Sequence, residues 1–311
     1  MALTRSEAKL ECAHYMWENE KDITYKLDSL QVIIDKTVKS VKAKKICVMS
    51  SRQVGKSYWA VTHTVEYLQN NPNKIARIIA PTLKQCGDIV QDNLIPITLD
   101  APPGLIVNKV SSYRWEFSNG SSLRLGAMER AHVDGNRGGN ASLVIYEECG
   151  FVDADDFTYA VNSVLAPQLL RSNGTELFVT SPSENPDHPL HTSIYPACES
   201  LGTAFQFTVL DSPSITPEMI LEAMRRSGCF LTEPFINILL SGLMSSANVH
   251  SHAITTGTIL SEAFRREYLA EIIRPSTLMV VPGFDPKIHV VPFKRPMFCN
   301  WSVTIDWGGV R

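Results

Sequence analysis

The segment from 44 to 71 constrains the fold most, because a short apolar run leads through a polar loop into a helical pattern. The run is KKICVM (44–49), the loop is SSRQVGKS (50–57) and the helical pattern is YWAVTHTVEYLQNN (58–71). A buried strand that enters a helix through Gly-Lys-Ser is suited to binding phosphate, since free backbone N–H groups and the helix dipole favour an anion there. The order predicts an α/β fold built around a phosphate-binding loop.

The loop gives two side chains a chemical task. Lys56 is expected to reach the β- and γ-phosphates of a nucleotide, and the Ser57 hydroxyl is expected to hold Mg²⁺. The regular pattern G-x-x-x-x-G-K-[ST] is broken at its first position, where this chain has Ser50. A chance Gly-Lys-Ser tripeptide is the alternative, and the strand before it and the helix after it favour the phosphate loop.

A second candidate strand ends in two acids. The run SLVIYEE (142–148) places Glu147 and Glu148 after four apolar or aromatic residues. An ATPase with a phosphate loop needs an acid near Mg²⁺ and a base that polarises the attacking water. Because consecutive strand residues point to opposite faces, Glu147 is expected to face the metal and Glu148 the water. A solvated acidic strand end is the alternative.

The rest of the chain alternates short apolar runs with helical stretches, which predicts a mainly parallel sheet with helices on both faces. Residues 105–127 read as small antiparallel strands, residues 204–210 read as one more strand, and residues near 154–171 and over 216–273 read as mostly helical. The 44% hydrophobic and 20% charged composition excludes a disordered chain, and the net charge of −3 excludes a uniformly basic nucleic-acid coat. No run approaches ~20 apolar residues, so no membrane span is predicted.

These motifs resemble the ATPase domain of tailed-phage large terminase subunits, the motors that package DNA. The most specific parts are S-R-Q-V-G-K-S (51–57), A-P-T-L-K-Q (80–85), R-G-G (137–139), L-V-I-Y-E-E-C-G-F-V (143–152), T-S-P-S (180–183) and F-R-R-E-Y-L-A-E (264–271). The resemblance covers nearly the whole chain. It implies a P-loop NTPase of the ASCE type with a small helical lid subdomain, and ATP and Mg²⁺ as cofactors.

The resemblance also implies roles for individual residues. Gln31 would read the adenine edge, with a surface glutamine as the alternative. The nucleotide-binding loop would comprise Ser51, Arg52, Gln53, Val54, Gly55, Lys56 and Ser57. Arg52 would contact the γ-phosphate or couple to the lid. Ser57 and Glu147 would hold Mg²⁺, although the family more often has Asp at the position of Glu147.

Two further motifs carry implied roles in catalysis and coupling. Arg137, in a Gly-rich loop, matches the arginine finger that one subunit supplies to the next, with a loop-capping arginine as the alternative. Thr180 and Ser181 match the coupling motif that senses the γ-phosphate, with strand-end capping as the alternative. Together with Lys56 and Glu148, Arg137 completes the expected catalytic set.

The expected domains are an ATPase core over 1–255, a lid and linker over 256–298, and the first strand of an RNase H-like nuclease over 299–311. Asp306 in V-T-I-D-W-G-G (303–309) matches the first metal-binding acid of that nuclease. The other nuclease acids are absent, so this chain alone is not expected to cut DNA. The full-length protein would also be an endonuclease.

The expected function is ATP-driven translocation of double-stranded DNA into a prohead, in the host cytoplasm and transiently at the portal. Partners would be the DNA, the portal protein, the small terminase subunit and further copies of the chain in a ring, with no membrane. Two alternatives stay open at this point. One is a helicase-like DNA-dependent ATPase, and the other is a nucleotide-binding scaffold with weak or no hydrolysis.

Overall fold

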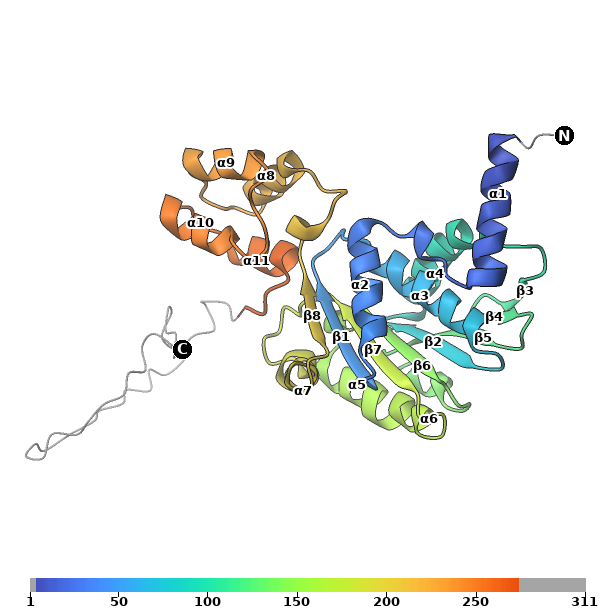
Figure 1. Ribbon diagram of the computed structural model, residues 1–311. Coiled ribbons are helices and arrows are strands. Elements are labelled where there is room, and N and C mark those ends of the chain that lie inside the picture. Colours follow the sequence, from blue (N-terminus) through green and yellow to red (C-terminus); the bar gives the residue numbers. More distant parts are fainter. Residues whose placement is uncertain (1–3, 274–311) are drawn as a thin grey trace, which may run out of the picture. The chain divides into compact units, whose positions relative to one another are not determined.

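Within residues 4–273, which the computed structural model describes without the side chains of 106–109, eight strands form one sheet (Figure 1). The strands are β1 (Lys45–Ser50), β2 (Ile75–Ala80), β3 (Ile106–Ser111), β4 (Arg114–Phe117), β5 (Ser122–Ala127), β6 (Leu143–Glu147), β7 (Thr175–Thr180) and β8 (Ala204–Phe207). The helices outside the 209–269 segment are α1 (Arg5–Tyr15), α2 (Ser29–Ser40), α3 (Lys56–Asn70), α4 (Leu83–Thr98), α5 (Ala154–Tyr159), α6 (Ala166–Leu170) and α7 (Tyr195–Ser200).

The strand order is β3-β4-β5-β2-β6-β7-β1-β8. Six strands are mutually parallel, and β4 runs antiparallel to both β3 and β5. The predicted mainly parallel sheet and the antiparallel pairs at 105–127 are therefore confirmed. One strand, β7, lies between β1 and β6, so the carboxyl ends of the phosphate-loop strand and the acidic strand lie at the same edge of the sheet.

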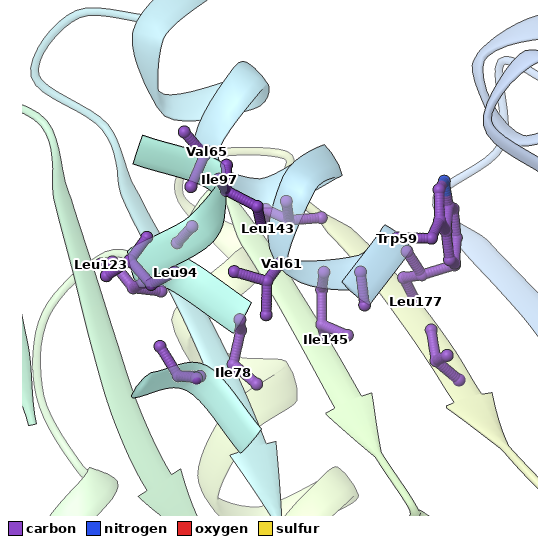
Figure 2. Packing of buried hydrophobic residues seen from close by; sticks show 14 of the residues in the cluster. Trp59, Val61, Val65, Ile78, Leu94, Ile97, Leu123, Leu143, Ile145 and Leu177 are labelled. Carbon is purple, nitrogen blue, oxygen red and sulfur yellow. The ribbon is translucent and has the colours of Figure 1, made fainter. Parts of the chain in front are cut away.

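Helices pack on both faces of the sheet, as the sequence predicts. On one face, Val61 of α3 and Leu94 of α4 pack with strand residues such as Ile145 (Figure 2). On the other face, Phe157 of α5 packs near Phe178 of β7, whose ring stacks on Tyr146 with centroids 4.5 Å apart. Burial of each such side chain contributes about 1.5–3 kcal/mol, so the two layers hold the sheet edge that carries the site.

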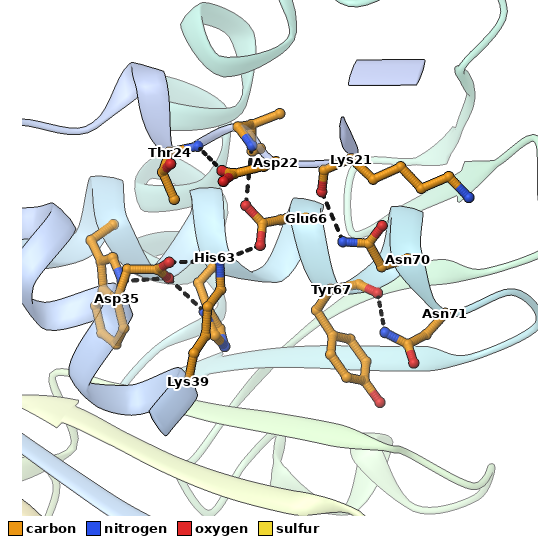
Figure 3. A network of polar contacts seen from close by, with 12 residues as sticks. Lys21, Asp22, Thr24, Asp35, Lys39, His63, Glu66, Tyr67, Asn70 and Asn71 are labelled. Atoms are coloured by element: carbon orange, nitrogen blue, oxygen red, sulfur yellow. Dashed lines mark hydrogen bonds and ion pairs between the residues drawn. The ribbon is translucent and has the colours of Figure 1, made fainter. Parts of the chain in front are cut away.

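A polar network fixes α2 on α3 (Figure 3). The Asp35 carboxylate of α2 accepts from Trp59 Nε1 at 3.2 Å and lies 3.0 Å from His63 Nδ1, both on α3. Lys39 forms ion pairs with Asp35 and with Glu66, which also accepts from a backbone N–H of the segment before α2. Because the carboxylates of Asp35 and Glu66 are buried and paired, removing one of their partners would leave an uncompensated charge and destabilise this contact.

Two predicted elements differ from the structure. The strand expected over 204–210 ends at Phe207, because Thr208 caps a 3-10 turn by accepting from Leu210 N–H while the Asp211 carboxylate accepts from Thr208 N–H. The helix expected near 154–171 contains a π-helical turn over Ala160–Leu165 between α5 and α6. Neither difference changes the position of β6 or β7.

The helices after β8 form an apolar cluster of their own. They are α8 (Pro217–Arg226), α9 (Glu233–Leu240), α10 (Val249–Thr256) and α11 (Glu262–Leu269). Their shared core runs from Val209 to Leu269 and includes Met224, Phe235 and Phe264. This helical subdomain includes residues on both sides of 255–256, and the lid boundary predicted there stays a prediction.

The described part of the chain contains no helix with the length and apolar character needed to cross a membrane. Asp306, the predicted nuclease strand over 299–311 and most of the predicted lid and linker lie outside the described residues.

Candidate functional site

The loop between β1 and α3 adopts two left-handed backbone conformations, at Gln53 (φ 63°) and Gly55 (φ 75°). Ser50 ends β1 as an extended residue, so the loop needs no glycine there. This is the physical reason why the departure from the regular motif at Ser50 is compatible with the loop. Gly55 is required for a second reason, because a Cβ atom on it would lie 2.2 Å from Gln31 Nε2.

Gln31 lies against the phosphate loop. Its Nε2 donates to the Gly55 carbonyl at 3.1 Å, and its Oε1 accepts from the Asp28 N–H at 3.0 Å in the capping box that begins α2. Both ends of the carboxamide therefore have partners within the chain. The role of Gln31 in reading adenine stays a prediction, and its observed contact supports the loop.

Lys56 and Ser57 begin α3 and face the acidic strand end. Lys56, only 5% exposed, makes an ion pair with the Glu148 carboxylate at 2.9 Å and donates to Ser181 Oγ at 3.2 Å. The Ser57 hydroxyl donates to the Glu147 carboxylate. The first turn of α3 thus meets the carboxyl ends of β6 and β7, and the structure brings together five of the predicted site residues.

Glu147 is a buried carboxylate that can accept more hydrogen bonds than its neighbours donate. It is 1% exposed, and its Oε2 has no hydrogen-bond partner in the described part of the chain. Burial, and then the charge of Glu148, raise the pKa of Glu147 to about 7 despite Lys56 and the Ser57 hydroxyl, which act in the opposite direction. A buried carboxylate oxygen without a partner beside a serine hydroxyl fits a hard cation that takes oxygen ligands.

Glu148 follows the strand in a left-handed backbone conformation (φ 51°), and its N–H donates to the Val179 carbonyl at 2.9 Å. Regular strand alternation would send Glu147 and Glu148 to opposite faces of the sheet. The left-handed turn ends this alternation, so that Glu147 reaches Ser57 and Glu148 reaches Lys56. Within the described residues, no three His, Cys, Asp or Glu side chains form a metal cluster, so a cation here would rely on substrate and water oxygens as well.

A cavity of about 630 Å³ opens over this cluster. Its lining includes Arg52, Lys56, Ser57, Glu148 and Phe151. The Arg52 guanidinium lies 5.5 Å from the centre of the Phe151 ring, a distance at which cation and ring attract. The cavity combines cationic, hydroxyl and carboxylate groups with one aromatic face, which suits a phosphorylated aromatic ligand.

Arg52 connects the phosphate loop to the helical subdomain. Its Nε lies 2.6 Å from Glu267 Oε2 on α11, and its N–H donates to the Glu267 carbonyl at 3.0 Å. The two roles that the resemblance implies for Arg52, contact with the γ-phosphate or coupling to the lid, stay predictions.

Hydrogen bonds of Thr180 and Ser183 hold the carboxyl end of β7 and the segment that follows it. Thr180 Oγ1 accepts from the Gly150 N–H at 3.0 Å and donates to the Ser181 carbonyl at 2.9 Å. Thr180 is 0% exposed, so its hydroxyl supports the loop after the acids, whereas the Ser181 hydroxyl contacts Lys56. Farther along, the Ser183 N–H donates to His191 Nε2 at 3.1 Å.

The structure does not place Arg137 at its own chain's phosphate loop. Its Nε donates to Asp134 at 2.8 Å and its Nη2 donates to the Tyr159 hydroxyl at 2.8 Å, and its side chain is 53% exposed. Ser51 and Val54 are buried, with Val54 in the hydrophobic core, and the Ser51 hydroxyl has no hydrogen-bond partner within the described residues.

Three residues of this region were missed as site residues by sequence reasoning: Phe151, His191 and Glu267. Phe151 and Glu267 lie inside quoted motifs, 143–152 and 264–271, so the motifs themselves were the available signal. His191 has none, because its spacing from His188 indicates only a weak metal pair. Burial instead lowers the pKa of His191 to about 4, which keeps its ring neutral and able to accept a hydrogen bond.

When the pH falls, we expect the His191→Gln variant to lose less folding stability than the wild type. An unfolded histidine binds a proton near its ordinary pKa of 6.5, whereas the folded one does so only near 4, so folding loses stability as the pH falls between these values. Urea unfolding at about pH 7.5 and about pH 5 should show the wild type losing roughly 2 kcal/mol more than the variant. Equal losses in both proteins would contradict the assignment of this pH dependence to His191.

Comparisons with known proteins agree with the geometry. The family model described as "Terminase large subunit, T4likevirus-type, N-terminal" matches residues 47–225, more than half of the chain. No protein with curated annotation gives a significant match.

Solved structures share the fold at low identity. An arginine-to-alanine mutant of the large terminase ATPase domain from Thermus phage P74-26 is 17% identical, with a TM-score of 0.50 over 88% of this chain and 100% of that one. The large terminase of a thermophilic bacteriophage in complex with ADP is 12% identical, with a TM-score of 0.58 over 87% of this chain. The HK97 large terminase is 17% identical, with a TM-score of 0.53 over 79% of this chain. The chain spans 60% and 50% of the last two proteins.

Proposed function

The chain belongs to the T4likevirus-type family of terminase large subunits, and on this premise we propose that it is the ATP-hydrolysing motor domain that drives double-stranded DNA into a prohead. The observation that carries the proposal is the meeting of Lys56, Ser57 and Glu148 in one cavity, with the buried Glu147 carboxylate hydrogen-bonded to Ser57. The match to the terminase family favours this function over a helicase-like ATPase. The complete set of four polar groups favours hydrolysis over a nucleotide-binding scaffold.

ATP would bind with its phosphates at the start of α3. Lys56, Ser57 and Tyr58 of the first turn of α3 line the cavity. The free N–H groups of a first helical turn and an ammonium group both favour a triphosphate. In the structure the Lys56 ammonium is paired with Glu148. A γ-phosphate that forms an ion pair with Lys56 would therefore release the Glu148 carboxylate. Binding of the substrate would in this way make the base available.

Ser57 and Glu147 would hold Mg²⁺. The fit is supported by the unpartnered Glu147 Oε2 and by the Ser57 hydroxyl on the other carboxylate oxygen. When bound, the cation would neutralise charge that develops on the phosphates. Because the pKa of Glu147 is raised to about 7, cation binding would release a proton from this carboxyl group below that pH.

Glu148, once released from Lys56, would accept a proton from the water that attacks the γ-phosphate. Its position immediately after β6, held by the hydrogen bond to the Val179 carbonyl, fixes the carboxylate beside the first turn of α3. Arg137 would act on the nucleotide of a neighbouring copy, since its own chain places it against Asp134 and Tyr159.

Coupling to movement would run through two connections. Ser181 at the end of β7 contacts Lys56, and Arg52 in the loop contacts Glu267 of the helical subdomain. A change in the phosphates therefore has a direct polar route to α11. Repeated cycles of this movement would translocate DNA, with the portal, the small terminase subunit and further copies of the chain as partners in the host cell.

The first test is ATP turnover with and without double-stranded DNA. We expect Mg²⁺-dependent hydrolysis that duplex DNA stimulates and that a chelator abolishes, because phosphoryl transfer at such sites needs the cation to neutralise charge. Turnover that the chelator leaves unchanged would contradict the assigned metal site. Stimulation by single-stranded but not by duplex DNA would favour the helicase-like alternative.

A further inference from the structure

Three arginines lie opposite one another on three neighbouring strands. Arg77 of β2 is the register partner of Arg124 of β5, and Arg124 is the register partner of Arg114 of β4. Neighbouring strands lie about 4.8 Å apart, so the three side chains start as a continuous row. Like charges directly opposite one another destabilise a sheet, so this row calls for a compensating negative charge.

The row lies on the face of the sheet that α3 and α4 do not cover, as the neighbours of the arginines in the sequence indicate. Ile78, Leu123 and Trp115, each next to one of the arginines in the sequence, belong to the cluster under α3 and α4, so the alternating arginines point to the other face. The cluster on that other face contains described residues of β1, β2, β6 and β7 but none of β4 or β5. The row is therefore not packed under helices α5 and α6.

A polar cavity of about 280 Å³ lies over the row. Arg77, Arg114 and Arg124 line it, together with Arg137 and the loop residue Gly138. Arg77 Nη2 donates to the Gly138 carbonyl at 2.8 Å. The Gly-rich loop thus forms one wall of the cavity and leaves four guanidinium groups around it.

The negative charge needed to balance these groups is only partly present. Glu116 pairs with Arg114 at 2.5 Å and Asp134 pairs with Arg137 at 2.8 Å. Within the described residues, the buried Nε atoms of Arg77, Arg114 and Arg124 have no hydrogen-bond partner.

Arg77 is the most enclosed member of the row, at 5% exposed. Its burial, and then the charge of Arg124, lower the pKa of Arg77 to about 10. A buried guanidinium with an unused donor, held beside a second cation, is the arrangement that an oxyanion stabilises.

We propose that the cavity formed by Arg77, Arg114, Arg124 and Arg137 binds a phosphate group. Guanidinium groups bind phosphate oxygens through paired N–H donors, and several can share one anion. Two sources could supply the phosphate to this chain: the backbone of duplex DNA, or the polyphosphate of a nucleotide held by a second copy. The second source rests on the proposed ATPase function, whereas binding of DNA can be measured without ATP.

The first arm measures binding of a short DNA duplex to the whole chain by fluorescence anisotropy, without nucleotide. Arg124→Gln is compared with Arg171→Gln, which removes the same charge from an exposed position at the end of α6. If the backbone is the source, Arg124→Gln should weaken binding about fivefold or more and reduce the salt slope by about one phosphate contact. Arg171→Gln should leave both unchanged.

The second arm measures ATP turnover at concentrations where copies associate. If the source is a neighbour's nucleotide, Arg124→Gln should leave DNA binding unchanged but lower turnover about tenfold or more, as loss of a charged group at a transferring phosphate does. Mixing with Glu148→Gln copies should then restore part of the turnover. If Arg124→Gln does not fold, both measurements are repeated with Arg114→Gln, which lies at the more exposed end of the row.

Variants of Arg124 and Arg114 that match Arg171→Gln in both arms would overturn the proposal. A wild-type chain that hydrolyses no ATP would contradict the proposed function. The DNA-binding measurement would still test whether the arginine cavity binds phosphate.

Discussion

Glu148→Gln is expected to lower ATP turnover by about 100- to 10,000-fold, the usual contribution of a general base. Glutamine keeps the size of the side chain but cannot take a proton from the attacking water. Nucleotide binding should persist and become tighter, because the variant lacks the carboxylate that pairs with Lys56 at 2.9 Å. The expected result is therefore a protein that binds ATP well and does not hydrolyse it.

Single-turnover hydrolysis and binding of a fluorescent ATP analogue, measured side by side, check this prediction. Glu199→Gln, an exposed acid on α7, is the matched control and should behave as wild type in both assays. Equal hydrolysis by Glu148→Gln and wild type would show that another group is the base. Loss of binding together with hydrolysis would show that Glu148 serves the fold of the site.

Sequence reasoning reached the centre of the site because its signals are local. The strand, loop and helix around Gly55 and the acids after Tyr146 are contiguous patterns, and their joining at one sheet edge follows from the parallel arrangement. The family match confirms the resemblance drawn from these motifs. The directions of Glu147 and Glu148 could not be predicted, since the left-handed backbone at Glu148 ends the strand alternation on which the expectation depended.

Contacts between segments that are distant in the sequence could not be predicted from the sequence. Arg52 and Glu267 are separated by most of the chain, and no periodicity relates them. The row of Arg77, Arg124 and Arg114 depends on the register of strands that are not all consecutive in the sequence, because β2 lies between β5 and β6. Periodicity indicates which face a residue occupies, but strand order and register decide which residues become neighbours.

Arg137→Ala is expected to lower turnover by about 1,000-fold or more, as removal of an arginine finger does. The reason lies in geometry: the side chain is exposed and contacts Asp134 and Tyr159 rather than its own phosphate loop. Mixing Arg137→Ala with Glu148→Gln in equal amounts should restore turnover to at most roughly a quarter of wild type, since head-to-tail contacts would complete about one site in four.

A purely structural role for Arg137 makes a different prediction. If the guanidinium only anchors its loop to the Tyr159 hydroxyl at 2.8 Å, Tyr159→Phe should lower turnover as Arg137→Ala does, and mixing with Glu148→Gln should restore neither. If Arg137 acts on a neighbour, Tyr159→Phe should keep most of the turnover, because the side chain must leave Tyr159 to reach the other copy. Rescue of Arg137→Ala together with an active Tyr159→Phe would therefore place this arginine at the site of the next copy.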